Sequence, residues 1–152
     1  TCLNHAPFVK QASLNAGDMI AIKGHVVMIS DVGEDPLGIA GIKSLAECKL
    51  ANMDIERFNF SIFQSAPTQG GIGVNRMRAR DYLATSSTMG RGMLDHAVNA
   101  CKAKFQNTAL VSKSTSASVV RHLGTADCMD ASAPIVLAKE ECLSSCSVHR
   151  LE

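Results

Sequence analysis

Two short apolar runs joined by two residues constrain the fold of this chain more than any other feature. The runs cover residues 19–22 and 25–29, and Lys23 and Gly24 separate them. Runs of five residues or fewer that are rich in β-branched side chains favour strands over helices. A two-residue link with glycine in second place suits a tight turn. The sequence therefore predicts an antiparallel hairpin.

Other parts of the chain add strands and one clear helix. Strand signals, which are apolar runs bounded by turn residues, occur at 58–63, 72–77, 108–112 and 118–123. Apolar residues recur at helical spacing between Gly92 and Phe105, so we expect a helix with one apolar stripe there. A shorter helix is expected over 45–53, inside a long inserted loop.

Composition excludes several classes of protein. The chain has 152 residues, one domain's length, and 46% of them are hydrophobic, as in globular proteins. Its 15 Lys and Arg against 14 Asp and Glu leave no basic excess for a nucleic-acid backbone, and aromatic residues are too few for base stacking. The longest uncharged run, residues 58–75, contains glycines and a proline, so we expect no membrane span.

Six cysteines are a high and even count for this length. We expect two or three disulfides, and therefore an extracytoplasmic location, either periplasmic or secreted. A reduced cytosolic protein with buried thiols is the alternative. Sequence alone does not choose among the possible pairings.

A cluster of cysteine and histidine residues near the C-terminal end could bind a metal ion instead of forming disulfides. It consists of Cys128, Cys142, Cys146 and His149. Zinc takes four nitrogen or sulfur ligands, so a zinc-stabilised regulatory domain is one alternative. The spacing matches no named zinc knuckle. We therefore favour disulfides here and expect neither a metal nor another cofactor.

The hairpin carries a histidine in a specific setting. Leu14 and the pair Gly17-Asp18 precede its first strand, and Gly24-His25-Val26 opens its second. This segment resembles the histidine-bearing hairpin of the NlpC/P60 cysteine peptidases. The resemblance continues through a strand that ends in a polar residue, a Pro/Gly-rich turn and a Gly-Val strand, and it covers about residues 9–83.

The resemblance implies an α+β fold, with a small antiparallel sheet and helices in a papain-like, NlpC/P60-type arrangement. Residues 1–83 would form this core, or its C-terminal part. Residues 84–152 would form a helical, Cys-rich and disulfide-stapled extension packed on the same domain. An insertion at 33–57 departs from the compact pattern of the family.

The resemblance also implies hydrolysis of amide bonds by a cysteine–histidine pair. A thiolate attacks the amide, and the histidine lowers the pKa of the thiol and later protonates the leaving amine. A third polar group holds the imidazole in one tautomer. We expect His25 to be the base and Gln64, on the neighbouring strand, to orient it. Asp31 and Ser65 are rival orienting groups.

The nucleophile is harder to assign. In the family it begins a helix well before the Gly-Asp pair, and here only Cys2 precedes His25. Residues 3–8 include Pro7 and are too few for that helix. We therefore expect the nucleophile to lie upstream of Thr1, with Cys2 as the candidate inside this chain.

Three arginines follow the fourth strand signal. Arg76, Arg78 and Arg80 would share one face of a strand. Because arginine binds carboxylates bidentately, we expect Arg76 and Arg78 to bind an acidic substrate such as a peptidoglycan stem peptide. A solvated surface is the alternative.

The predicted function is therefore a cysteine peptidase or amidase acting on bacterial cell-wall peptides. The chain would then be a processed fragment. The alternative from another class is a non-catalytic extracytoplasmic binding or structural module that lacks the nucleophile. The two differ in one requirement, a reactive thiol within reach of His25.

Overall fold

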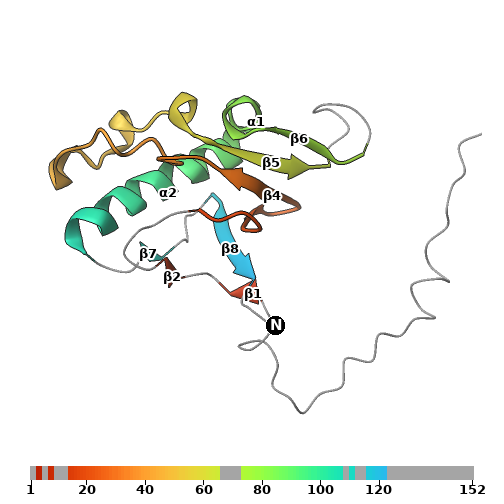
Figure 1. Ribbon diagram of the computed structural model, residues 1–152, viewed down its shortest axis with the longest axis horizontal. Helices are drawn as coiled ribbons and strands as arrows, with labels where there is room; N and C mark the ends of the chain where they lie inside the picture. The colour runs from red at the N-terminus through yellow and green to blue at the C-terminus, as the bar shows by residue number, and fades with distance from the viewer. Residues whose placement is uncertain are drawn as a thin grey trace, which may run out of the picture.

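The computed structural model of this chain describes residues 3–4, 7–8, 14–65, 73–107, 110–111 and 116–122. The strands are β1 (Leu3–Asn4), β2 (Pro7–Phe8), β3 (Met19–Ile22), β4 (His25–Val32), β5 (Phe60–Gln64), β6 (Asn75–Arg78), β7 (Leu110–Val111) and β8 (Ser118–His122). The helices are α1 (Ala79–Thr85) and α2 (Ser87–Gln106), with short 3-10 turns η1 (Leu45–Glu47), η2 (Leu50–Asn52) and η3 (Ile55–Arg57). Figure 1 shows the sheet and helices of this α+β fold, which confirms the predicted class.

The sheet has the order β1-β8-β3-β4-β5-β6, and all neighbouring strands are antiparallel. The two-residue β1 extends one edge, so five strands form the body of the sheet. β2 and β7 form a separate pair. The last two strand signals would pair with each other as neighbours along the chain, but β7 pairs with β2, and β8 pairs with β1 and β3. The hairpin leaves one edge of β3 open, and β8 fills it.

The predicted hairpin is confirmed as β3 and β4. Met19 pairs with Met28 and Ile22 pairs with His25, so the turn consists of Lys23 and Gly24. Gly24 has a φ of +84°, a backbone conformation that glycine adopts without steric cost. The turn therefore fixes the register of the hairpin and places His25 at the very start of β4.

The sheet has one buried and one exposed face. Along β4, Val27 and Ile29 are buried while Val26 and Met28 are exposed, as a period of two requires. A register shift between Ile29 and Asp31 interrupts this alternation near the end of the strand. The helices lie against the buried face.

Helix α2 forms the second layer of the core. It begins at Ser87, five residues before the expected start, and ends with Asn107 in the left-handed conformation. A Cβ atom added to Gly92 would overlap Ala117, just before β8. Glycine inside this helix therefore permits close packing rather than ending the helix.

The arginine segment is not one strand. β6 ends at Arg78 and α1 begins at Ala79, so Arg80 lies on a helix. The expectation that three arginines share a strand face is therefore wrong for Arg80. The domain boundary expected after residue 83 falls within α1, between residues that pack in the core.

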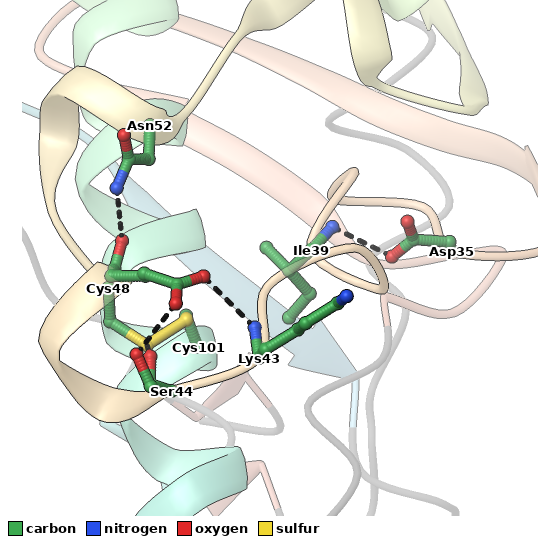
Figure 2. The surroundings of a disulfide bond; sticks show 8 residues. Asp35, Ile39, Lys43, Ser44, Cys48, Asn52 and Cys101 are labelled. Atoms are coloured by element: carbon green, nitrogen blue, oxygen red, sulfur yellow. Dashed lines mark hydrogen bonds between the residues drawn. A yellow bond between two sulfur atoms is a disulfide. The ribbon is translucent and has the colours of Figure 1, made fainter.

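The inserted segment between β4 and β5 contains three 3-10 turns instead of the short helix expected over 45–53. Cys48, between η1 and η2, has a ψ of 65°, which is not helical. Its sulfur bonds to Cys101 of α2 across a sequence separation of 53 residues (Figure 2). This pair is a disulfide of the kind the sequence predicts. The other four cysteines, Cys2, Cys128, Cys142 and Cys146, lie outside the described residues.

Candidate active site

His25 lies on the inner face of the sheet, at the edge where β4 begins. It precedes the buried Val27 by two residues and therefore shares its face. The imidazole Nε2 is enclosed and has no hydrogen-bond partner among the described residues. The ring stands 6.3 Å from the ring of Tyr82, between centroids. One ring nitrogen is thus kept from solvent, as a positioned base requires.

Gln64 is the last residue of β5 and is only 2% exposed. Met28 pairs with Phe63, so the next antiparallel step places Gln64 opposite Val27. His25 lies two residues before Val27 on the same face. Gln64 and His25 are therefore diagonal neighbours on adjacent strands, within the reach of long side chains. No hydrogen bond joins the Gln64 side chain to His25 Nε2, so the orienting role stays a prediction.

The rival orienting groups are less well placed. Asp31 is six residues further along β4, about 20 Å away at 3.3 Å per residue. Its carboxylate accepts hydrogen bonds from Arg76 and Ser30, and these lower its pKa, with Arg76 contributing most. Ser65 follows β5 and is exposed. Of the three candidates, only Gln64 lies buried beside His25.

Arg76 and Arg78 lie on the other face of the sheet. Both are exposed, and they alternate along β6 with partly buried neighbours that face the core. Arg76 pairs with Asp31 at 2.5 Å across β5, and Arg78 pairs with Asp81 at 2.7 Å. The carboxylate-binding role therefore stays a prediction for the exposed face, away from His25.

The cysteines divide into two groups. Cys48 and Cys101 are bonded to each other and buried, so neither sulfur is a nucleophile in this state. The candidate nucleophile Cys2 lies outside the described residues, as does the proposed zinc cluster around Cys146 and His149. Within the described ranges, no group of three His, Cys, Asp or Glu side chains is placed to hold a metal ion.

A buried ion pair that sequence reasoning missed stabilises the start of the hairpin. Asp18 is 1% exposed, and both of its carboxylate oxygens accept from Arg121 of β8 at 2.7 Å. The backbone N–H of Asn15 also donates to Asp18 at 2.7 Å. The Gly17-Asp18 pair can be seen in the sequence, but Arg121, the partner of Asp18, lies 103 residues away.

His96 of α2 lies in the core near this ion pair. Burial lowers the pKa of its imidazole to about 4, and the negative charge of Asp18 only partly opposes that shift. The side chain is only 4% exposed. It is therefore a neutral core residue at neutral pH.

Tyr82 is a further residue beside the candidate site. It lies on α1, is 3% exposed and faces His25. Burial raises the pKa of its phenol, while a hydrogen bond with Ser86 works in the other direction. No sequence pattern separated this tyrosine from other core positions.

Comparisons with models of protein families, with curated proteins and with solved structures find no match to this chain. The resemblance to NlpC/P60 peptidases therefore stays a prediction from the sequence motif around His25. Of the helices in the described part of the chain, none combines the length and the apolar composition that crossing a bilayer requires.

Proposed function

We propose that this chain carries the histidine half of a cysteine peptidase or amidase of NlpC/P60 type, with papain-like topology. The observation that carries the proposal is the buried placement of Gln64 diagonally across from His25, on the inner face of the sheet. A buried uncharged amide is unexpected at this position in an unrelated hairpin, because burying a polar side chain is unfavourable unless the side chain is hydrogen-bonded.

The chemistry follows from the two ring nitrogens. His25 Nε2 is enclosed and has no hydrogen-bond partner among the described residues. In the proposed active state its N–H donates to the amide oxygen of Gln64, after the two side chains move into contact. Nδ1 then remains available to take the proton of a thiol. The thiolate attacks the amide carbon, and His25 gives that proton to the leaving amine. Water then hydrolyses the thioester, which releases the carboxylic acid and restores the thiol. Gln64 holds the ring in the required tautomer throughout.

Within this chain the candidate nucleophile is Cys2, which lies outside the described residues. The substrate is an amide bond of an acidic peptide, above all a peptidoglycan stem peptide. The disulfide between Cys48 and Cys101 supports an oxidising compartment, so we place the activity outside the cytoplasm.

Hydrolysis of purified stem peptides by the full encoded protein tests the proposal. His25→Ala should remove about 10²–10⁴-fold of the rate, because a positioned acid–base group contributes that much. Arg91→Gln is the matched control, since Arg91 lies on the exposed side of α2 and pairs only with Asp95 among the described residues. A folded His25→Ala protein with the control's rate would refute the proposal. It would favour a non-catalytic binding module instead.

A further inference from the structure

The inserted segment between β4 and β5 is more highly organised than a connection requires. It spans residues 33–59, and connections longer than about 12–15 residues without regular structure are usually functional. The carboxylate of Asp35 accepts from the backbone N–H groups of Ile39 and Ala40, both at 2.9 Å. The segment therefore has a defined shape of its own.

Hydrogen bonds of Glu47 hold the middle of the segment together. The disulfide between Cys48 and Cys101 ties it to α2 (Figure 2). The Glu47 carboxylate accepts from the backbone N–H of Lys43 at 3.1 Å and the hydroxyl of Ser44 at 2.8 Å. The side-chain amide of Asn52 donates to the Glu47 carbonyl at 2.8 Å. The covalent link to α2 starts at the next residue, Cys48. Ligand-binding loops on a rigid scaffold are built in this way.

These turns border an open cavity of about 670 Å³. Ligand sites in proteins range from about 300 to 1,000 Å³. The apolar side chains of Ile42 and Met53 line it and are buried, whereas Glu47, Asp54 and Arg57 line it and are exposed. The cavity thus combines an apolar base with charged groups of both signs.

The charged groups do not neutralise one another. Asp54 caps η3 and Arg57 ends it, and residues three apart in a 3-10 turn lie on the same side. Even so, no ion pair joins Arg57 to Asp54 or Glu47 within this described segment. Asp54 uses one oxygen to accept from the N–H of Glu56 at 3.0 Å. Its second oxygen and the Arg57 guanidinium remain open to a ligand.

We propose that this cavity binds a short peptide with a free ammonium group, a free carboxylate and an aliphatic side chain. The carboxylate pairs bidentately with Arg57, the ammonium pairs with Asp54 and Glu47, and the aliphatic group packs on Ile42 and Met53. A purely anionic ligand would meet two carboxylates, and a purely cationic ligand would meet the guanidinium. Only a zwitterion satisfies both signs.

This site is separate from the candidate active site and does not depend on the proposed function. The segment leaves the sheet at the end of β4 and returns at the start of β5, whereas His25 and Gln64 lie at the opposite ends of these strands. Eight strand residues at about 3.3 Å each separate the two regions by about 25 Å.

Titration of the ¹⁵N-labelled protein with the dipeptide Leu-Leu, followed by amide NMR shifts, tests the proposal. Saturable shifts confined to residues 41–57 are expected. N-acetyl-Leu-Leu and Leu-Leu-amide each lack one charge and should bind at least about tenfold more weakly, since each loses a charge-assisted hydrogen bond. Equal affinity of the capped peptides, shifts centred on His25, or no saturable shift would each overturn the proposal.

Two variants extend the same titration. Arg57→Gln should weaken Leu-Leu at least about tenfold and abolish the preference over Leu-Leu-amide. Asp54→Asn keeps a capping side chain and should reduce the preference over N-acetyl-Leu-Leu. The matched control Arg91→Gln should bind as the unchanged protein does. The comparison of Leu-Leu with the capped peptides uses the unchanged protein. It therefore still tests the proposal if a variant fails to fold.

Discussion

Protonation of His96 should control the acid stability of this fold. The imidazole is 4% exposed on the core side of α2, and burial lowers its pKa to about 4 from the ordinary value of 6.5. In the unfolded chain the same side chain titrates near 6.5. Above that pH, His96 is neutral in both the folded and the unfolded state, so its titration does not change the free energy of unfolding.

Between pH 6.5 and about 4, the unfolded chain binds a proton that the folded state excludes. The free energy of unfolding therefore falls as the pH is lowered through this window, and stops falling below it. A difference of one unit between the pKa values of the two states corresponds to about 1.4 kcal/mol. The whole decrease in the free energy of unfolding is therefore about 3 kcal/mol. That is a large part of the stability of a single domain.

Urea unfolding near pH 7 and about pH 4.5 measures the effect. His96→Gln removes the titrating group, so its stability should fall by about 2–3 kcal/mol less over this interval than that of the unchanged protein. His25→Ala is the control and should keep the full dependence, since it leaves His96 in place. An equal slope in the His96→Gln protein would refute the reasoning.

The remaining predictions concern the core and the candidate site. Replacing Cys48 and Cys101 by alanine should lower the free energy of unfolding, measured by urea titration, by about 4 kcal/mol, because the disulfide closes a loop across 53 residues. Unchanged stability would contradict this. Arg121→Met should cost about 3–5 kcal/mol, because it leaves the buried Asp18 carboxylate unpaired, whereas the exposed control Arg91→Gln should cost less than about 1 kcal/mol. Gln64→Ala should lower kcat more than it raises KM, and less than His25→Ala does; a normal rate would remove Gln64 from the site.

Local patterns predicted the hairpin and the placement of its histidine. A two-residue turn fixes the pairing of β3 with β4, and alternation then assigns His25 and Gln64 to the inner face. The strand pairing follows from residues close together in sequence, and the face follows from the alternation of side chains with a period of two along a strand. The role of Gln64 as an orienting group stays a prediction.

Contacts between distant residues could not be predicted in the same way. The partner of Asp18 is Arg121, and the open edge of β3 is filled by β8, which follows the helices. The apolar periodicity predicts a start at Gly92, whereas α2 begins at Ser87, so Gly90 and Gly92 lie inside the helix. They allow close approach to Leu83 and Ala117. Tertiary packing overrode local propensity at these positions.

The most direct test of the proposed function is the rate of thiol modification by iodoacetamide near pH 6.5, mapped by mass spectrometry on the full encoded protein. An unperturbed thiol has a pKa of about 8.5 and reacts slowly there. We predict one rapidly modified cysteine, with Cys2 as the candidate in this chain, whose reactivity falls sharply in His25→Ala and is unchanged in Arg91→Gln. Uniformly slow labelling, or a fast cysteine indifferent to His25, would contradict the proposed cysteine–histidine pair.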